Sequence, residues 1–570
     1  MMCPVTGDSS RVPLPLSVVL ERIGLQADTV PAATSLGQAR AGRELVQNFK
    51  AMPDSLEWQL ADLHWTSEGV FPFTEGVVPY LVNNTGTLSA DAAAVLLANC
   101  KETPSTGPIH VLELGAGTGL FARYFLDEFR RRCEDESRDF YERLSYWVTD
   151  RSPRTVEQWH ERDVFGPHVQ HVVTRVSDAN TAHAVLTEPV RAVFANYVLD
   201  LLPSAVVRQR EGRWEQLHVR TWITSDTGVL RQYTTLTIDE IRGFARSAEP
   251  ELVGQLLALL PLLEGEEGFF PVGPDDLPGL DTLSAGTSCG AFLYNWAALR
   301  CVGTLLPRLE QDGFFLIHDY EAGPLEDGRT WAATQRFGPA IGVGLDFRPL
   351  EQHVRAAGFE SLKPAGDDLL KTHPRLILRS ELRGTRETFE ARFASSARNE
   401  AASSIDEARQ QADAGWLAEA LISYRAALEL SPSDWQLMGE AASVATRLRD
   451  HATALELART AVALNPWYDA FLWNVLGDAL AGLGRDLDAH ECYAQAYRIH
   501  PRDVQTNLKL AGSWLTRGDP ARSLEAVARG LAHDAEGMFR HLLLDKQRQA
   551  IDCLSARWNV ERQAAARKRR

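Results

Sequence analysis

One short stretch of the sequence concentrates residues that could hold a small ligand. Residues 111–121 read VLELGAGTGLF, in which an apolar run with the acid Glu113 leads into a loop containing Gly115, Ala116, Gly117 and Gly119. Glycine adopts positive φ angles easily and lets a ligand approach the backbone closely. A strand, a glycine turn and a helix in this order present backbone N–H groups and a helix N-terminus to a ligand. The stretch therefore predicts a ligand site, with a purely structural turn as the alternative.

Acidic residues follow the next two apolar stretches, where further strands would end. Asp150 ends the run SYWVTD, and Ser177 and Asp178 end the run VQHVVTRVSD. A carboxylate can accept hydrogen bonds from both hydroxyls of a ribose, which neutral side chains of that length cannot do. Asp150 is therefore our candidate for binding a sugar, and a helix N-cap is its alternative role.

Two later strands carry the candidates for proton transfer. The segment FANYVLDLLP places Asn196 at a strand end, Tyr197 after it and Asp200 one helical turn on, and LIHDYE contains His318, Asp319 and Tyr320. A protonated amine, a hydroxyl or a carboxamide needs a base if it is to act as a nucleophile. His318 has the most suitable pKa range. Each of these residues also has a structural alternative. Asn196 could hydrogen-bond to backbone groups at the end of the strand, Asp200 could cap a helix, and His318 could be buried in the core.

The elements that position these residues alternate between strand and helix. Strands are expected at 110–114, 145–150, 169–178, 191–203, 313–321 and 374–379, with helices at 120–132, from Pro153 and at 289–309. Ser152 before Pro153 is a typical helix start. Such alternation predicts a doubly wound parallel sheet with its ligand at the carboxyl ends of the strands.

The flanking and inserted segments have weaker patterns. Before the sheet we expect helices at 16–23, 36–49 and 89–100, with Ser89 as an N-cap, and the aromatic segment 71–88 as either a packed loop or a lid. The pattern of residues 214–235 predicts a hairpin or extra strands with a turn near 226–228. Residues 237–263 have a helical pattern, and an acidic Gly/Pro-rich patch follows them.

The C-terminal part repeats itself. Pro432, Pro466 and Pro501 lie 34 and 35 residues apart, and Gly415/Gly484, Ala420/Ala454/Ala489 and Tyr424/Tyr493 recur in step with them. A weaker copy covers 504–534, with Gly518 in its turn, and the helix 539–558 should cap the array. Small residues at fixed steps are typical of paired helices that approach closely, and this period resembles the tetratricopeptide (TPR) repeat.

Composition restricts the class of protein. The 570 residues carry a net charge of −17, which argues against a nucleic-acid partner because phosphate binding needs clustered Lys and Arg. Seven scattered cysteines without a C-x-x-C pair fit reduced thiols and no metal site. The sequence shows neither a signal peptide nor a membrane-spanning stretch, so we expect a cytoplasmic protein.

The pattern E-x-G-x-G-x-G followed by a strand ending in Asp resembles the site of class I methyltransferases that use S-adenosylmethionine (SAM). The resemblance implies that Glu113, the loop 115–119, Asp150, Ser177, Asp178 and Asn196 bind SAM, with Asp150 on the ribose and Ser177 and Asp178 near the adenine. It implies a Rossmann-like, doubly wound α/β domain at 106–385 with an inserted cap at 214–290. The expected domain order also includes three further parts: a helical or lid region at 1–105, an all-α TPR solenoid at 400–534, and a capping helix with a basic tail at 535–570.

The segments 194–203, 316–321 and 345–359 resemble, in order, motifs of the MidA-type family, which is associated with protein methylation, including that of arginine. This chain departs from the family pattern at Tyr197, where the family has Glu, and at Glu321, where it has Gly. A guanidinium favours carboxylate partners, so the change at Tyr197 weakens the case for arginine, although Asp200, Asp319 and Glu321 could supply acids.

Three functions therefore remain. The leading hypothesis is a methyltransferase acting on a protein or peptide recruited by the groove of the repeats, with Asp200, His318, Asp319, Tyr320 and Tyr197 as the catalytic candidates. The second is a small-molecule methyltransferase whose repeats make a homodimer. The third is a non-catalytic assembly factor that keeps a SAM-binding fold.

Overall fold

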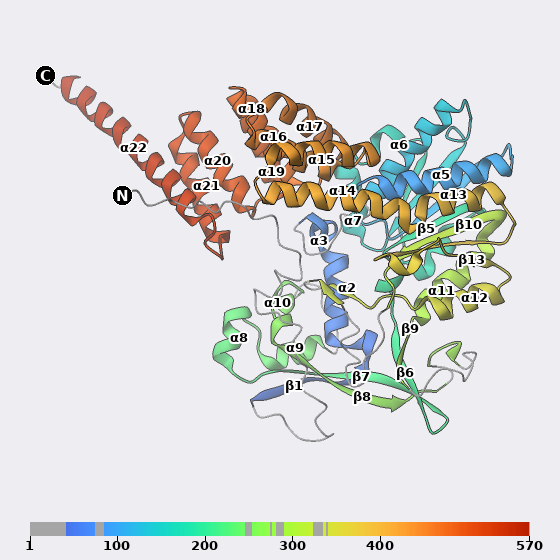
Figure 1. Ribbon diagram of the computed structural model, residues 1–570. Helices are drawn as coiled ribbons and strands as arrows, with labels where there is room; N and C mark the ends of the chain where they lie inside the picture. Colours follow the sequence, from blue (N-terminus) through green and yellow to red (C-terminus); the bar gives the residue numbers. More distant parts are fainter. Residues whose placement is uncertain are drawn as a thin grey trace. The chain divides into compact units, whose positions relative to one another are not determined.

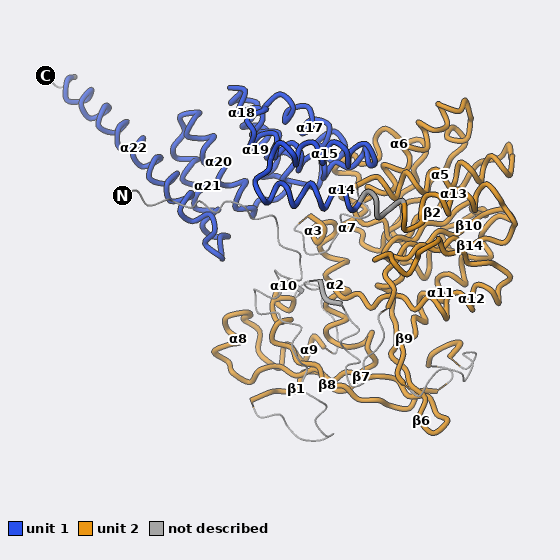
Figure 2. Tube along the Cα trace, viewed as in Figure 1, with its two compact units in different colours: residues 1–12, 399–570 blue, residues 13–398 orange. Residues whose placement is uncertain are grey.

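The computed structural model describes residues 42–74, 85–245, 253–273, 276–280, 290–322, 335–337 and 340–568. The chain divides into two compact units, which we name the α/β unit (residues 13–398) and the helical unit (residues 399–570), shown in Figure 2. The helix predicted at 16–23, and most of the segment 71–88, lie outside the described residues.

The α/β unit is built on a seven-stranded sheet in the order β13-β14-β10-β5-β2-β3-β4. Its strands are β2 (Ile109–Leu114), β3 (Leu144–Asp150), β4 (Val172–Val176), β5 (Val190–Asn196), β10 (Leu309–Asp319), β13 (Glu360–Leu362) and β14 (His373–Leu378). Strands β4, β3, β2, β5 and β10 pair in parallel, and β14 is antiparallel to both of its neighbours. The chain runs outward from β2 to β4 and returns to β5 on the other side of β2, which makes the β2–β5 boundary a topological switch point.

Helices cover both faces of this sheet (Figure 1). They are α5 (Thr87–Glu102), α6 (Leu120–Asp135), α7 (Pro153–Glu161), α11 (Trp296–Leu305), α12 (Phe347–Ala356) and α13 (Arg383–Phe393). In β5, Phe194 contacts Phe125 of α6, whereas its neighbour Val193 belongs to a hydrophobic cluster that includes Val302 of α11. Because successive side chains of a strand point to opposite faces, α6 and α11 lie on opposite sides of the sheet.

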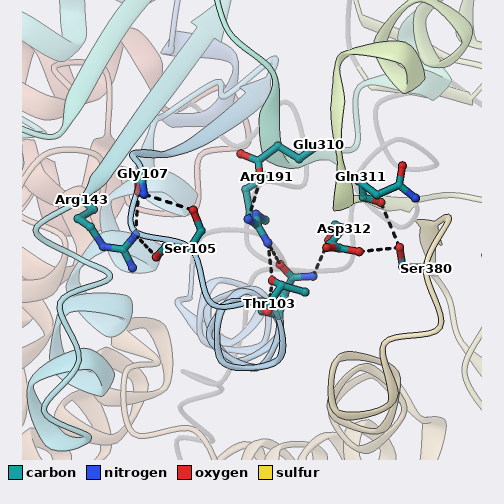
Figure 3. Close-up of polar contacts among 10 residues, drawn as sticks. Thr103, Ser105, Gly107, Arg143, Arg191, Glu310, Gln311, Asp312 and Ser380 are labelled. Carbon is teal, nitrogen blue, oxygen red and sulfur yellow. Dashed lines mark hydrogen bonds and ion pairs between the residues drawn. The ribbon is translucent and has the colours of Figure 1, made fainter.

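A polar network ties the amino ends of the central strands to α5, at the edge opposite the predicted ligand site (Figure 3). Arg191 at the start of β5 pairs with Glu310 at 2.6 Å and donates to Thr103, which follows α5. Asn99 of α5 donates to the carbonyl of Asp312 at 2.9 Å. Since Arg191 is only 7% exposed, its charge needs these partners.

A second, antiparallel sheet is formed by five strands in the order β1-β7-β6-β9, with β8 paired to β7. The strands are β1 (Arg43–Ala51), β6 (Ala205–Arg210), β7 (Arg213–Thr224), β8 (Leu263–Pro271) and β9 (Phe292–Tyr294). Glu211 and Gly212 have φ angles of 51° and 75°, which suit the tight turn between β6 and β7. The remaining short elements are α2 (Leu56–Glu68), α3 (Phe71–Thr74), α8 (Thr227–Tyr233), α9 (Ile238–Phe244), α10 (Val253–Leu257), β11 (Gln335–Phe337) and β12 (Ala340–Gly342).

Several expectations for the flanking segments were wrong. The predicted helix at 36–49 is the strand β1 over its described part, because pairing with β7 overrides the local helical pattern. The predicted helix at 289–309 contains β9 before α11 begins at Trp296, and part of the acidic patch forms β8. The hairpin turn lies at 211–212 rather than 226–228, where Asp226 instead caps α8.

The start of α5 also differs from the prediction. The helix begins at Thr87 after Gly86, so Ser89 is not its N-cap. The Ser89 hydroxyl instead donates to the carbonyl of Phe121 at 2.9 Å and joins α5 to α6. By contrast, Ser152 caps α7 as expected, its hydroxyl accepting from the Thr155 N–H at 3.2 Å.

The helical unit consists of successive helix pairs at the predicted period. After α14 (Ser395–Asp413) come α15 (Leu417–Leu430), α16 (Trp435–Arg447), α17 (His451–Leu464), α18 (Ala470–Gly482), α19 (Asp486–Ile499), α20 (Val504–Thr516), α21 (Pro520–His533) and α22 (Arg540–Lys568). The recurring alanines, such as Ala420, Ala454 and Ala489, are buried between helices. The periodic small residues thus permit the close helix packing that the repeat needs.

We predict that the turn at Arg449 is the strained member of an otherwise regular series. Gly415, Gly484 and Gly518 have φ angles of 79°, 75° and 72°, and the equivalent Arg449 has a φ of 63°. Arg449→Gly should raise the free energy of unfolding of the helical unit by about 0.5–1 kcal/mol, because relief of the left-handed strain exceeds the entropy cost of glycine. Hydrogen exchange of the α16 and α17 amides in the full chain measures this change.

The matched control is Gly484→Ala, at a position where an added Cβ meets nothing within 4 Å. It should lower the same free energy by about 0.5–1 kcal/mol through backbone strain alone. Loss of protection in the Arg449→Gly variant would contradict the assignment of strain.

Candidate active site

A cleft opens at the carboxyl ends of β2 and β5, where the sheet topology switches. Together with its mouth it contains about 1480 Å³ of space outside protein atoms. The predicted residues that line it are Glu113, Gly115, Ala116, Gly117, Asp150, Ser177, Asp178, Asn196, Tyr197, Asp200 and Tyr320. Gly119, His318 and Asp319 are not part of this lining. The fold thus brings most of the predicted set, drawn from five strand ends, around one hollow.

The glycine loop after β2 adopts the conformation that its sequence predicts. Gly115, Gly117 and Gly119 have φ angles of 56°, 53° and 76°, in the left-handed region that glycine tolerates. A Cβ on Gly115 would lie 2.6 Å from Val198, and one on Gly117 would lie 3.1 Å from Phe73. Gly119 precedes α6 and packs against Trp159 and Phe165, so it supports the conformation of the loop without lining the cleft.

Asp150 fastens the glycine loop to the end of β3. Its Oδ2 accepts from the Gly117 N–H at 3.0 Å, and its Oδ1 accepts from the Ser152 N–H at 2.9 Å. Burial raises the pKa of this carboxyl to about 6, and the two backbone hydrogen bonds oppose that rise. Each carboxylate oxygen retains a further lone pair, so Asp150 can still accept a hydrogen bond from a ligand in the cleft.

Glu113 lies deeper, at the floor of the cleft. It is only 2% exposed, and its Oε2 accepts from the Tyr146 hydroxyl at 2.9 Å. Burial raises the pKa of Glu113 to about 8, and nearby Asp150 adds to the rise. In the ligand-free protein Glu113 is therefore mainly protonated at neutral pH.

Ser177 and Asp178 follow β4 on the same rim. The Ser177 N–H donates to the Asp150 carbonyl at 2.8 Å, and Asp178 Oδ1 accepts from the Asn180 N–H at 2.8 Å. Asp178 therefore caps the short 3₁₀ helix that begins at Ala179, and both residues also face the cleft.

The end of β5 combines backbone strain with unsatisfied polar atoms. Tyr197 has a φ of 53°, a conformation that is uncommon outside glycine and that clusters at functional sites. Asn196 is 8% exposed, and neither its Oδ1 nor its Nδ2 has a hydrogen-bond partner among the described residues. An unpaired buried polar group costs about 1–3 kcal/mol, so the Asn196 amide favours a ligand that would engage it.

Asp200 and Asp319 form a buried carboxyl pair beside Asn196. Asp319 Oδ2 accepts from the Leu199 and Asp200 N–H groups at 3.0 and 3.3 Å, and the two carboxyls hydrogen-bond to each other. Burial raises the pKa of Asp200 to about 6, and burial together with the Asp200 charge raises the pKa of Asp319 well above its usual range. Burial thus favours a state in which the pair shares one proton, and of the two carboxyls Asp200 faces the cleft.

His318 and Tyr320, on β10 and just after it, have different surroundings. His318 is fully buried, and its Nε2 shares a hydrogen bond of 3.1 Å with the Thr372 hydroxyl. Tyr320 lines the cleft, and its ring centroid lies 5.1 Å from that of Tyr197. The geometry thus gives Tyr320 and Tyr197, rather than His318, access to a molecule in the cleft.

The α2 part of one wall of the cleft was not predicted from the sequence, whereas Phe73 of α3 belongs to the segment 71–88 that was expected to be a packed loop or a lid. This wall is made by Trp58, Ala61, Asp62 and Trp65 of α2 and by Phe73 of α3. The spacing i, i+3, i+4 and i+7 places the α2 residues on one helix face, a signal that was readable in the sequence. Asp62 also pairs with Arg151 at 2.5 Å, next to the ribose candidate Asp150.

The described residues contain no group of His, Cys, Asp and Glu side chains arranged to hold a metal ion. Within the same residues, no helix combines the length and the apolar character that crossing a bilayer requires.

Comparisons with known proteins agree with this site. Residues 92–335 match the model of a family described as "Putative S-adenosyl-L-methionine-dependent methyltransferase". None of the curated proteins matches the sequence.

Solved structures are similar to parts of this chain. An "uncharacterized ACR" protein from Burkholderia thailandensis is 14% identical, with 61% of this chain and 75% of that chain covered and a TM-score of 0.34. A TPR protein of Thermus thermophilus is 20% identical, with 27% of this chain and 89% of that chain covered and a TM-score of 0.25. The first TPR of Spaghetti bound to an HSP90 peptide is 22% identical, with 20% of this chain and 91% of that chain covered and a TM-score of 0.20.

The family match covers the glycine loop, Asp150, Asn196 and Asp200, which line the cleft. The chain is therefore an enzyme, a SAM-dependent methyltransferase with SAM as its cofactor, and it carries a helical part with a TPR-like repeat period.

Proposed function

We propose that this enzyme transfers a methyl group to a side chain of a protein or peptide that the helical unit recruits. The observation that carries the proposal is the joining of a ligand cleft at a topological switch point to TPR-like helix pairs in one chain. Such pairs stack into extended surfaces that suit peptide segments.

The residues of the cleft fit SAM by their chemistry. The turn 115–117 offers a backbone surface with little side chain, and Asp150 offers a carboxylate with acceptor capacity for two ribose hydroxyls. Ser177 and Asp178 lie on the neighbouring rim, where the adenine would follow the ribose. The parallel sheet, with this turn at its switch point, supports the Rossmann-like fold that we expect.

The chemistry that SAM supplies is an activated methyl group on a sulfonium sulfur. The protein contributes position and a dry environment, because alignment of reacting groups can provide about 7–11 kcal/mol of the barrier reduction. The apolar walls that exclude water from the cleft are Trp58, Trp65, Phe73, Phe121 and Ile341. Among these walls lie three polar groups of the types that an acceptor needs, Asp200, Tyr197 and Tyr320.

The MidA-like motifs keep Asn196, Asp200 and Asp319; the first two line the cleft, and Asp319 lies behind them, where it accepts from the Asp200 N–H. The family's Glu is Tyr197 here, and Tyr197 lines the cleft as well. The site thus offers an aromatic ring where a guanidinium would favour a carboxylate. This difference supports an acceptor other than arginine within the same reaction type.

We predict that SAM binding depends on the ionised form of Asp150. Its pKa of about 6 is raised by burial, and ribose hydroxyls would donate to the ionised carboxylate and favour it. The dissociation constant of SAM should therefore fall about tenfold as the pH rises from about 5 to about 7. Glu113, with a pKa of about 8, stays protonated over this range.

The control for this prediction is Asp150→Asn, in which the residue cannot titrate. Isothermal titration should show weaker binding at neutral pH and no trend between the two pH values. An equal pH trend in the wild type and in the Asp150→Asn variant would assign the titration to another group.

We predict that removal of the repeats impairs the methylation of a protein but leaves SAM binding intact. The truncation should follow Ala394, because Glu102 of α5 accepts from the Gly384 and Thr385 N–H groups at the start of α13. We expect an at least tenfold loss of kcat/KM for the protein acceptor, with the dissociation constant of SAM unchanged within threefold.

Unchanged SAM binding is the control that the shortened α/β unit is folded. If the truncated enzyme methylates its acceptor as well as the full chain does, recruitment by the repeats is wrong. A small acceptor would then replace the protein, and the repeats would serve another purpose such as dimer formation.

A further inference from the structure

Two buried side chains at the end of β5 hold hydrogen-bonding atoms that no other described part of the protein engages. They are Oδ1 and Nδ2 of Asn196, which is 8% exposed, and Oδ1 of Asp200, which is 5% exposed. Both residues line the cleft. Because buried polar atoms in folded proteins are normally paired, these three atoms indicate where a bound molecule supplies the partners.

Aromatic rings lie next to these atoms, tilted relative to one another. The Tyr197 ring lies 5.1 Å from the Tyr320 ring and 5.2 Å from the His318 ring, centroid to centroid. The left-handed φ of Tyr197 turns the backbone directly after Asn196, so the amide and the tyrosine belong to one bend. Of these rings, Tyr197 and Tyr320 line the cleft, so the unengaged polar atoms are bordered by apolar aromatic surface.

The unengaged atoms also define the hydrogen-bonding pattern of that group. The Asn196 amide offers one N–H₂ donor and one carbonyl acceptor, and Asp200 adds a further acceptor. A carboxamide has the complementary set, since its carbonyl can accept from Nδ2 while its N–H groups donate to the two oxygens. A guanidinium or an ammonium has only donors and would leave Nδ2 unpaired, and a carboxylate would face the Asp200 charge.

We propose that the methyl acceptor is the nitrogen of a neutral carboxamide, held by Asn196 and deprotonated by Asp200. The inference rests on the proposed function and specifies its substrate as a glutamine or asparagine side chain. Nitrogen forms a bond to the methyl carbon while the bond from that carbon to the sulfonium sulfur breaks, and sulfur keeps that electron pair as a neutral thioether. The nitrogen loses one proton, which Asp200 Oδ1 accepts.

The carboxyl pair explains why Asp200 can take this proton. The two buried carboxyls share one proton, so the resting pair carries one negative charge inside the protein. Acceptance of a proton makes the pair neutral, which burial favours. Asp319 thus acts as a positioning residue, fixed by the Leu199 and Asp200 N–H groups.

The first test uses small probes and does not depend on protein recruitment. The full chain, saturated with S-adenosylhomocysteine, is titrated with the N-acetyl methyl esters of glutamine, arginine and glutamate, of which only the first carries a primary carboxamide, followed by ligand-observed NMR. The glutamine and glutamate probes differ only at the side-chain terminus. We expect the glutamine probe to bind at least fivefold more tightly than the glutamate and arginine probes.

A charge-changing variant sharpens this test. Asn196→Asp replaces the donor–acceptor amide by a carboxylate of the same shape, so preference should reverse toward the arginine probe. A thermal unfolding midpoint close to that of the wild type shows that the variant is folded. Equal probe binding in the wild type, or tighter binding of the arginine probe, would overturn the inference.

The second test examines the product. Cell extract incubated with the enzyme and isotopically labelled SAM is digested, and mass spectrometry locates the labelled methyl group. A methylated glutamine or asparagine supports the inference, whereas a methyl group on arginine or lysine overturns it and leaves the proposed protein methylation intact. Absence of any labelled protein, together with selective binding of the glutamine probe, would overturn protein methylation and assign the carboxamide to a small molecule.

Asp200→Asn tests the proton acceptor. This variant keeps a hydrogen-bonding side chain but cannot take the proton, so kcat should fall at least about a hundredfold. Its KM for the acceptor and its SAM dissociation constant should each change less than threefold. A fall in kcat below tenfold would show that Asp200 does not receive the proton.

Discussion

The cleft depends on the hydrogen bond between the Gly117 N–H and the Asp150 carboxylate, 3.0 Å long. This bond joins the turn after one strand to the end of the next, so the glycine loop and the ribose candidate occupy fixed positions relative to each other. The backbone reinforces it, because the Ala116 N–H donates to the Thr149 carbonyl at 2.9 Å. A carboxylate that is already oriented by two N–H groups needs no rearrangement to receive a ligand.

The parts of the fold that depend on short-range patterns were predictable from the sequence. The strand–glycine–helix stretch, the Ser152 cap and the repeat period each contain their own physical signal, and each appears where it was expected. Residues 43–51 and 292–294 were not recognised as strands, because their pairing partners lie far away in the sequence. Strand formation of this kind is decided by tertiary contacts rather than by local preference.

The candidate site was likewise predictable only where short-range sequence patterns determine it. Acids at strand ends could be placed at one edge of the sheet, because parallel strands share the direction of their carboxyl ends. Only the folded structure shows which of these residues face the cleft. Asp200 faces it, whereas Asp319 and His318 are buried behind it. The spacing of Trp58 and Trp65 was readable in the sequence, but it fits residues packed in the core equally well, and only the position of the helix reveals that they line the cleft.

The contact between Phe73 and the glycine turn has a consequence for turnover. The ring of Phe73 lies against the glycine turn, since a Cβ added at Gly117 would come within 3.1 Å of it. A nucleoside seated on that turn would share its surroundings with this ring. Exchange of a nucleoside at this turn would therefore be sensitive to the position of that ring.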